Sequence, residues 1–361
     1  MGIAYAEGWQ SWTPPTTGPE GHGLLVVSDE DGVRAYLDRD GGPLTLESMG
    51  SAEEIAGPDL NAALAAVGER LAPGLLRPIP PGWCSWSRYF AHVTADDVIE
   101  NVDAARALEL PIEIVQVDDG WEAGIGDWLD VSPRFGSLRE VVARIRDAGM
   151  HAGIWTAPFL VGEKSALAAA HPDWIVPGAD AGSNWGQSLG VIDLSRDAAA
   201  EHLGRVFRTL AAWGFTYFKL DFLFAGALPS VDHYREGLRI IREAAGTEAI
   251  LLGCGAPIFP SIGLVDAMRI GPDVLPELPG ETPDLAHVIR STAARSWMNG
   301  RLWINDPDTL VARPEIAERE EWAAHLERYR GLAFSSDRLA ALDDRGVELT
   351  RRVLSSPQVR S

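Results

Sequence analysis

Cysteine is scarce in this chain: only Cys84 and Cys254 occur among its 361 residues. Neither has a second cysteine or a histidine at a metal-ligand spacing, so the sequence indicates neither a disulfide framework nor a zinc site. Long apolar runs are also lacking, and the first residues have neither the basic region nor the apolar region of a signal peptide. We therefore expect a soluble, cytoplasmic protein with no membrane partner.

Basic residues are few relative to acidic ones. The 31 Lys and Arg residues stand against 52 Asp and Glu residues, which gives a formal net charge of -21 at pH 7. A protein of this charge repels nucleic acid phosphates and anionic lipid surfaces, so we expect no nucleic acid partner and a neutral substrate. Tryptophan, in contrast, is abundant: the chain has 13, and their flat apolar rings pack well in cores and also stack on sugar rings.

The pattern of the chain changes near the proline-rich stretch Pro78 to Pro81. Before it, Leu24 to Val27 and Val33 to Leu37 have the composition of short β-strands joined by a turn. After it, strand-like and helix-like segments alternate. We therefore predict a short β-rich N-terminal segment over residues 1–79 and a second unit over residues 80–361.

The unit over residues 80–361 alternates short apolar runs with amphipathic helical patterns. Thr94 with Asp97 resembles a capping box at one helix start, Ser195 is a candidate N-cap of another, and Gly214 is a helix stop. Eight such alternations predict an α/β fold, a (β/α)8 TIM barrel, with its chemistry at the C-terminal strand ends. The predicted strands are residues 82–86, 112–117, 151–155, 215–220, 250–252, 267–269, 302–304 and 332–334.

Two of these strands end close to a carboxylate and carry a cation. Lys219 and Asp221 are two residues apart on one strand, so their side chains point to the same face, and Arg269 precedes Asp273. Two carboxylates at neighbouring barrel strand ends are what a glycosidase needs, one as nucleophile and one as general acid/base. A cation on an inward strand face needs a buried partner, and the nearest in sequence are Asp221 and Asp273. We expect these two ion pairs to keep the nucleophile ionised.

Further candidate side chains lie at the same strand ends. Each also has a structural interpretation, because an Asp after a strand is often a helix N-cap or turn former, a Trp packs a barrel mouth, and a Cys is often a small buried hydrophobe. Together, however, these residues indicate a site. Its members are Trp86, Asp118, Asp119, Trp155, Lys219, Asp221, Cys254, Arg269 and Asp273.

Six motifs in this unit resemble those of the α-galactosidases of glycoside hydrolase family 36. They occur in order between Gly82 and about Ala341, at residues 116–121 (QVDDGW), 153–158 (GIWTAP), 218–227 (FKLDFLFAGA), 252–257 (LGCGAP), 268–273 (MRIGPD) and 303–308 (WINDPD). The resemblance implies that Asp221 is the nucleophile and Asp273 the acid/base. It also implies that galactose is contacted by Asp118, Asp119, Trp155, Lys219, Cys254 and Arg269.

The N-terminal segment carries one more motif. Residues 7–12 (EGWQSW) are similar to a motif in the family's N-terminal β-sandwich, where a loop tryptophan helps to close the site. One interpretation is that Trp12, or else Trp9, forms a wall of the pocket; the other is that both only pack the segment onto the barrel. The chain is shorter at both ends than is usual for the family, so we expect an abbreviated form. Apolar surface left uncovered would favour a homo-oligomer.

The sequence thus favours a retaining α-galactosidase that acts on a small-molecule α-galactoside and needs neither a metal nor a cofactor. In a double displacement, Asp221 attacks the anomeric carbon while Asp273 protonates the departing oxygen and later deprotonates water. Two alternatives stay open. Asp118, Asp221 and Asp273 are also suited to hold Mg²⁺ in a metal-dependent lyase or isomerase, and a barrel that only binds carbohydrate is the second. A galactose transferase of the same mechanism is not distinguished by the sequence.

Overall fold

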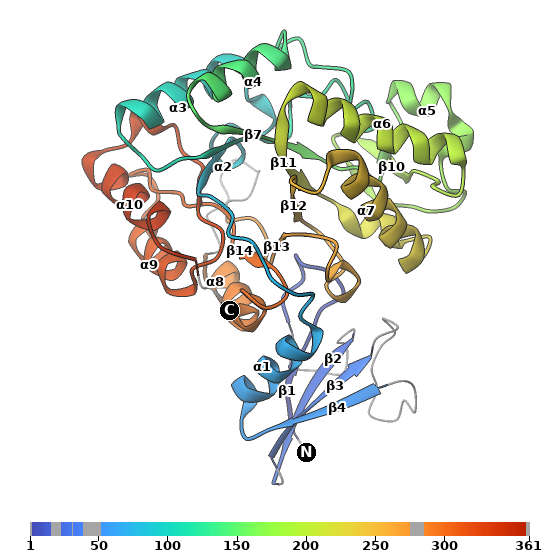
Figure 1. Ribbon diagram of the computed structural model, residues 1–361, viewed down its shortest axis with the longest axis vertical. Helices are drawn as coiled ribbons and strands as arrows, with labels where there is room; N and C mark the ends of the chain where they lie inside the picture. The colour runs from blue at the N-terminus through green and yellow to red at the C-terminus, as the bar shows by residue number, and fades with distance from the viewer. Residues whose placement is uncertain (1, 16–22, 31, 39–51, 275–284, 359–361) are drawn as a thin grey trace.

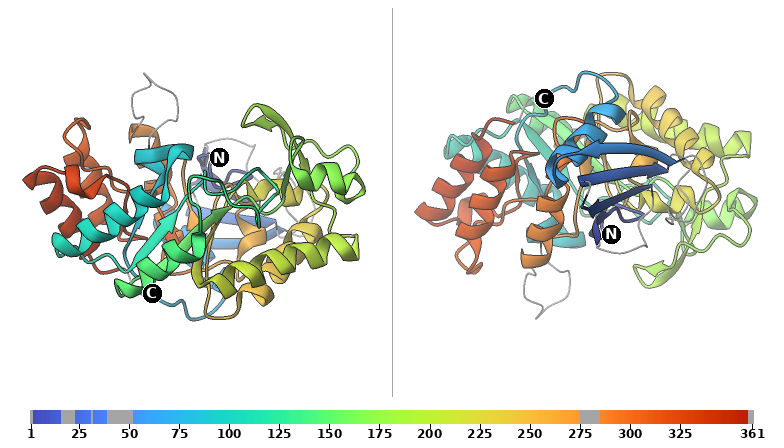
Figure 2. Two further views of the ribbon diagram at one scale, coloured as in Figure 1. Left: turned by 90° about the horizontal axis from the view of Figure 1, so that it is seen from above. Right: turned by 90° about the horizontal axis from the view of Figure 1, so that it is seen from below.

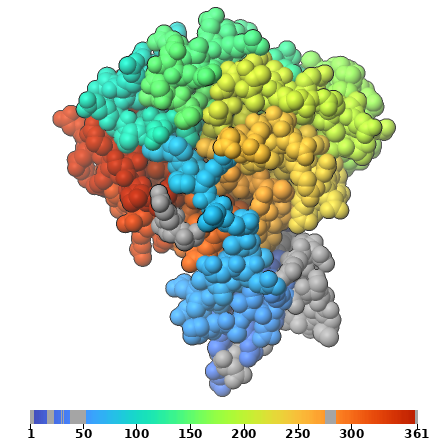
Figure 3. All heavy atoms as spheres, viewed as in Figure 1, coloured from blue at the N-terminus to red at the C-terminus, as the bar shows by residue number. Residues whose placement is uncertain are grey.

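The computed structural model describes residues 2–15, 23–30, 32–38, 52–274 and 285–358 of the chain. A small sheet with one helix stands below a larger assembly of strands and helices, and the space-filling view shows this N-terminal part as a narrower projection (Figures 1 and 3). Within the described residues, no helix is both long enough and apolar enough to cross a bilayer.

The N-terminal sheet confirms the predicted β-rich segment. Its antiparallel strands lie in the order β1 (Gly2–Ala6), β2 (Leu24–Asp29), β3 (Gly32–Asp38) and β4 (Ala52–Gly57). Side chains of β2 alternate between its two faces, as a strand requires: Leu24 and Val26 join the main core, whereas Leu25 and Val27 belong to a separate small cluster.

Helix α1 (Leu60–Leu71), which the sequence patterns above do not predict, follows the sheet. It begins at Asp59, whose carboxylate accepts a hydrogen bond from the Ala62 amide (2.9 Å) as an N-cap. The helix approaches the end of β4 closely, since a Cβ added at Gly57 would lie 2.7 Å from the Ala63 nitrogen.

Residues beyond this helix form a (β/α)8 barrel, as predicted. Its eight parallel strands lie in the order β14-β13-β12-β11-β7-β6-β5-β15, and one backbone hydrogen bond, from the Leu332 amide to the Asn305 carbonyl (2.7 Å), links the β14 and β15 ends. The strands are β5 (Gly82–Cys84), β6 (Ile114–Val117), β7 (His151–Thr156), β11 (Phe215–Leu220), β12 (Ile250–Gly253), β13 (Ala267–Arg269), β14 (Ile304–Asp306) and β15 (Phe334–Ser335).

The helices surround the strands (Figure 2). They are α2 (Trp86–Tyr89), α3 (Ala95–Ala107), α4 (Leu138–Asp147), α5 (Ala166–Ala170), α6 (Asp197–Trp213), α7 (Val231–Ala245), α8 (Leu285–Ala294), α9 (Arg319–Tyr329) and α10 (Asp344–Leu354). The 3-10 helices among the described residues are η1 (Phe90–His92), η2 (Pro172–Trp174), η3 (Leu223–Ala227), η4 (Phe259–Ser261), η5 (Ser296–Met298) and η6 (Leu339–Ala341). The predicted capping box is present, since Thr94 and Asp97 each accept a hydrogen bond from the other's amide.

Several predicted boundaries are wrong. Ser195 is not the N-cap of α6, because its hydroxyl donates to Asp193 (2.5 Å) and the cap position is Arg196, without a side-chain cap. Trp86 does not lie on the first strand, which ends at Cys84; it begins α2 instead. The second strand and the last two strands start two residues after the predicted positions. Apolar residues continue beyond the ends of these strands, so the apolar pattern does not mark where a strand begins or ends.

A small sheet is inserted between β7 and α6. It consists of β8 (Leu160–Gly162), β10 (Gln187–Val191) and β9 (Ser183–Asn184) in that spatial order, all antiparallel. The tight connection between β9 and β10 places Trp185 in a left-handed backbone conformation, with φ of 50°. This insertion contributes side chains to the site described below.

A buried arginine joins the N-terminal segment to the barrel. Arg295, which follows α8, is fully buried together with Glu7, and its Nε and Nη2 donate to Glu7 Oε1 (3.1 and 2.5 Å). Its Nη1 donates to the carbonyls of Ser11 (2.6 Å) and Ile270 (3.0 Å), and its Nη2 also donates to that of Thr13 (2.5 Å). One guanidinium therefore fixes the loop that carries Trp12 against the end of β13.

Candidate active site

A cavity of about 400 Å³ opens at the C-terminal ends of the barrel strands. Side chains from β7, β11, the loops after β6 and β13, the β9–β10 connection and the N-terminal segment meet there. Its lining residues are Trp12, Trp86, Asp118, Asp119, Trp155, Asn184, Trp185, Lys219, Asp221, Phe222, Pro272 and Asp273. Most of the candidate residues from the sequence are thus brought together, and Asn184, Trp185, Phe222 and Pro272 are additions.

Asp221 lies directly after β11 and is 8% exposed. Its Oδ2 accepts a hydrogen bond from the Trp155 indole (2.9 Å), and its Oδ1 accepts one from the Phe222 amide (2.8 Å). Burial raises the pKa of Asp221 above its ordinary value, while the Lys219 charge and the Trp155 hydrogen bond act in the opposite direction. Two N–H donors therefore hold the carboxylate in a fixed orientation at the cavity wall.

Asp273 lies four residues after Arg269 and is more open, with its side chain 36% exposed. Arg269 donates to one carboxylate oxygen (2.6 Å) and the Trp86 indole donates to the other (3.0 Å). The predicted pair of Arg269 with Asp273 is confirmed. Asp221 and Asp273 thus face one cavity from two strand ends, one enclosed and one accessible.

Arg269 itself lies behind the cavity, 2% exposed, and is shared among three carboxylates. Besides Asp273, it donates from Nε to Asp306 (2.9 Å) and from Nη2 to Asp308 (2.8 Å). Asp308 also accepts the Val274 amide (2.6 Å), which fixes the chain directly after Asp273. Burial raises the pKa of Asp308 to about 6, against the opposing effect of Arg269.

The predicted ion pair of Lys219 with Asp221 is wrong. Lys219 Nζ donates to Asp118 (2.9 Å), which also accepts from the Gln116 amide group (2.6 Å) and the Cys84 thiol (3.3 Å). Burial lowers the pKa of Lys219, but the charges of Asp118 and Asp221 outweigh this effect, and the pKa lies well above its ordinary value. Lys219 therefore stays charged, and it influences Asp221 through space without contacting it by a hydrogen bond.

Asp119 has a different environment from its neighbour. Its Oδ2 accepts a hydrogen bond from the indole of Trp185 (2.8 Å), and burial raises the pKa of its carboxyl group above the ordinary value. The ring of Trp185 also packs edge-on against Trp155, with 6.2 Å between ring centroids, and against Phe222 at 5.1 Å. Trp185 is a site residue that the sequence patterns above do not predict. The only local sign of Trp185 in the sequence is the turn-like stretch Asn184-Trp185-Gly186, which is typical of a hairpin.

Trp12 reaches the cavity from the N-terminal segment. Its indole donates to the Cys254 sulfur (3.2 Å), and its ring packs against Phe222 and over Gly255, where an added Cβ would lie 2.7 Å from the ring. Cys254 itself is buried behind this contact and does not line the cavity. Trp9 is 38% exposed and also lies outside the lining, so Trp12 is the tryptophan placed to form a wall.

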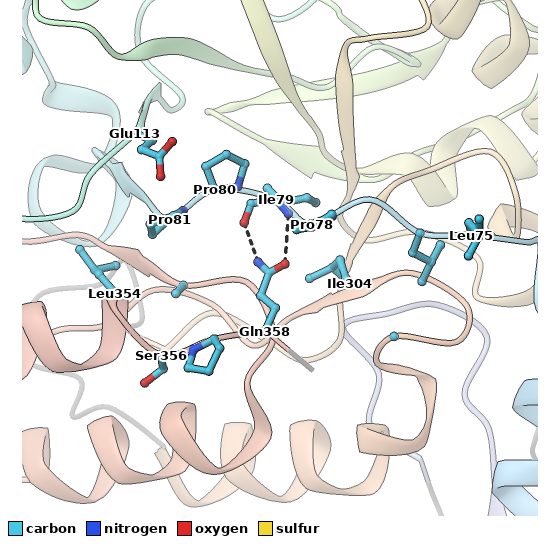
Figure 4. A pocket seen from close by; sticks show the side chains of 14 residues that line it. Leu75, Pro78, Ile79, Pro80, Pro81, Glu113, Ile304, Leu354, Ser356 and Gln358 are labelled. Atoms are coloured by element: carbon cyan, nitrogen blue, oxygen red, sulfur yellow. Dashed lines mark hydrogen bonds between the residues drawn. The ribbon is translucent and has the colours of Figure 1, made fainter. Parts of the chain in front are cut away.

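A larger cavity, about 660 Å³, lies at the opposite end of the barrel. It is lined mainly by proline and aliphatic side chains from the linker before β5 and the C-terminal residues (Figure 4). There the Gln358 side chain accepts from the Ile79 amide (3.0 Å) and donates to the Ile79 carbonyl (2.6 Å). Because the N-terminal ends of barrel strands serve stability, we assign this region a structural role.

Within the described residues, no group of three His, Cys, Asp or Glu side chains is arranged to hold a metal ion.

Comparisons with known proteins show that the chain is similar to α-galactosidases. The family model of the melibiases matches residues 73–225. Two solved structures of TtGalA, an α-galactosidase from Thermus thermophilus, are similar to the whole chain. The complex with p-nitrophenyl α-D-galactopyranoside gives a TM-score of 0.85 and 30% identity, covering 98% of this chain and 86% of that one. The complex with stachyose gives a TM-score of 0.84 and 31% identity, covering 100% and 90%.

The similarity to a third protein extends over fewer residues. The bifunctional α-galactosidase/sucrose kinase AgaSK of Mediterraneibacter gnavus is 35% identical over 100 residues, which are 26% of this chain and 10% of that protein. The chain therefore matches only about a tenth of that relative's length.

Proposed function

Because the chain belongs to the melibiase family of α-galactosidases, we propose that it is a retaining α-galactosidase that releases terminal α-linked galactose by double displacement. The observation that carries this proposal is the pair Asp221 and Asp273 facing one cavity in unlike environments. An enclosed carboxylate with fixed orientation suits a nucleophile, and an accessible one suits the exchange of protons with the leaving group and water.

In the first step, Asp221 attacks the anomeric carbon and Asp273 donates a proton to the departing oxygen. In the second step, Asp273 removes a proton from water, which attacks the glycosyl-enzyme, so the configuration at the anomeric carbon is retained. The N–H donors from Trp155 and Phe222 aim the Asp221 carboxylate, and Trp86 with Arg269 fixes Asp273.

Substrate recognition is assigned to Asp118 and Asp119, which accept hydrogen bonds from sugar hydroxyls, with Lys219 beside them. The axial 4-hydroxyl of galactose is the natural target, because an epimer that misplaces this hydroxyl leaves a buried carboxylate unpaired. Trp12, Trp155 and Trp185 supply ring surface around the sugar. The complexes of the Thermus thermophilus relative with a nitrophenyl galactoside and with stachyose support this substrate class.

The proposal is tested with a panel of nitrophenyl α- and β-glycosides, together with proton NMR of the sugar first released. We expect hydrolysis of the α-galactoside well above that of the α-glucoside, with α-galactose as the first product. Release of β-galactose first would exclude retention, and an absence of turnover on every α-galactoside would exclude the proposed function.

Hydrolysis is expected to survive exhaustive treatment with EDTA. Lys219 already forms an ion pair with Asp118, and Arg269 forms one with Asp273. A divalent cation between these carboxylates would therefore be repelled by two positive side chains. The transition state is also positively charged, which makes a nearby cation unfavourable. The measurement is the hydrolysis rate before and after chelation. Loss of activity that Mg²⁺ restores would favour the metal-dependent lyase or isomerase.

Replacing Trp12 by alanine should raise KM for galactosides severalfold while changing kcat less. Trp12 forms a cavity wall, so its ring contributes to substrate binding, and its half-buried position limits the loss of stability. Trp9→Ala is the matched control, because Trp9 belongs to the same loop but lies outside the lining. The wall assignment is wrong if Trp12→Ala melts several degrees earlier but keeps the KM of the parent enzyme.

A further inference from the structure

Asp273 lies on a loop and not on a strand. It follows the end of β13 by four residues, and its side chain is 36% exposed, so packing alone does not fix its carboxylate. One carboxylate oxygen accepts a hydrogen bond from Arg269 (2.6 Å), and the other accepts one from the Trp86 indole (3.0 Å). The direction in which Asp273 presents a proton therefore depends on the residues that hold Arg269 and Trp86.

Asp308, in the loop after β14, holds the first of these donors. Its Oδ1 accepts a hydrogen bond from Arg269 Nη2 (2.8 Å), and its Oδ2 accepts one from the amide of Val274 (2.6 Å). One carboxylate thus contacts both the arginine that binds Asp273 and the backbone directly after Asp273. Asp308 is buried and does not line the cavity, so it acts on Asp273 only through these contacts.

Thr309, the next residue, holds the second donor. Its hydroxyl hydrogen-bonds to that of Ser87 (3.0 Å), and Ser87 directly follows Trp86 at the start of α2. The Ser87 amide in turn donates to Ser336 Oγ (2.8 Å). Consecutive residues of one loop are therefore connected to both donors of Asp273.

The backbone at Asp308 has an unusual conformation. Its φ is 80°, in the left-handed region that residues other than glycine rarely adopt. Such a conformation persists only where the surroundings determine it. Here the Asp308 amide donates to Asp306 (2.9 Å), and Asp308 Oδ1 also accepts the Thr309 amide (2.7 Å). These contacts keep the Asp308 side chain in one position despite the unfavourable backbone.

We propose that Asp308 and Thr309 are positioning residues for the acid/base, Asp273. Asp308 holds Arg269, and Thr309 holds the first turn of α2, so both donors of Asp273 keep their direction. This inference rests on the proposed function and deepens it, since it names the residues that aim the acid/base at the departing oxygen. Their loss should weaken proton transfer in both steps and leave the sugar-binding wall in place.

The variant Asp308→Asn tests this role most directly. Asparagine has the shape of aspartate and is one of the few residues besides glycine that tolerate a positive φ. It has one acceptor oxygen, however, and its amide nitrogen would face a donor, either Arg269 or the Val274 amide. One of the two contacts that position Asp273 is therefore lost.

The measurement is kcat/KM for a series of aryl α-galactosides from nitrophenyl to phenyl, because kcat/KM reports the steps up to departure of the leaving group. For the poor leaving groups, Asp308→Asn should lower kcat/KM by on the order of 10- to 100-fold, a part of what general acid catalysis contributes. Nitrophenyl galactosides, which need little protonation to depart, should change much less. Their kcat should fall, because Asp273 also activates water, and azide should restore it. Competitive inhibition by galactose should change little.

The matched control is Asp266→Asn. Asp266 directly precedes β13, at the opposite end from Asp273, and it also accepts hydrogen bonds from an arginine, Arg242 (2.6 Å), and from a backbone amide, that of Leu251 (2.8 Å). This variant should lose stability without any dependence of the rate on the leaving group. Equal losses of kcat/KM on good and poor leaving groups in Asp308→Asn, with no rescue by azide, overturn the proposal.

The variant Thr309→Val decides the question if Asp308→Asn does not fold. Valine has nearly the shape of threonine and removes only the hydroxyl that bonds to Ser87, so a smaller loss with the same dependence on the leaving group is expected. A loss that is equal on all substrates overturns the proposal. A parent enzyme that hydrolyses no α-galactoside overturns the proposed function and this inference with it, whereas an active parent whose variants show no leaving-group dependence overturns this inference alone.

Discussion

The Asp221→Ala variant is expected to lose turnover on every galactoside, by on the order of 10⁴-fold or more, because no glycosyl-enzyme can form without the nucleophile. The side chain accepts hydrogen bonds from Trp155 and Phe222 and forms no ion pair with any residue that the structure describes, so its removal should leave the fold intact. Initial rates on aryl and sugar leaving groups, with a melting curve as control, provide the measurement.

The Asp273→Ala variant should show a different pattern. Hydrolysis of galactosides with poor leaving groups should fall by about 10²- to 10⁴-fold, whereas activated aryl galactosides, which need little protonation to depart, should lose far less. Added azide should restore turnover of the activated substrates, since it attacks the glycosyl-enzyme without needing a general base. Equal losses on good and poor leaving groups, with no azide rescue of either variant, would show that the two roles are assigned wrongly.

The Arg295→Met variant is expected to lower the melting temperature by roughly 10 °C, the largest effect on stability that we predict. Without the guanidinium, Glu7 is left as an unpaired buried charge, and the carbonyls of Ser11, Thr13 and Ile270 lose a donor. Removing one partner of a buried ion pair lowers the free energy of unfolding by about 3–5 kcal/mol. KM for galactosides should rise as well, because the same contacts hold the Trp12 loop.

Two further variants show whether the effect comes from the unpaired charge. In the double variant Glu7→Gln/Arg295→Met the buried charge is gone, so it should be less destabilised than the sum of the single changes. Arg338→Met removes one partner of an exposed pair with Glu100 and should leave the melting temperature nearly unchanged. A fall in Arg295→Met no larger than in Arg338→Met would contradict a clamp between the N-terminal segment and the barrel.

The fold was predictable because its signals are local. Strands buried on both faces appear as short apolar runs, and capping residues such as Thr94 with Asp97 mark helix starts within a few positions. The errors occur where apolar residues lie just outside a strand, as at Trp86 after β5 and at Leu302 before β14. Helix α1 was missed because its short amphipathic pattern follows a β-rich region that favours another strand.

Most of the site was also predictable, because barrel chemistry gathers at strand ends. Asp221 directly follows β11, and Asp273 lies four residues after the end of β13, so both lie at the same rim whatever the order of the strands. The TIM barrel and this pair of carboxylates are therefore determined by the sequence itself, through patterns that span a few residues.

Which side chains pair across the rim was decided only by the tertiary structure. Lys219 bonds to Asp118, 101 residues away, and not to Asp221 two residues away. Alternation along a strand fixes the face that a side chain occupies, but the curvature of the barrel decides which other strand end faces it. Trp185 comes from a loop whose path no periodicity describes, so its contact with Asp119 exists only once the barrel and the inserted sheet are in place.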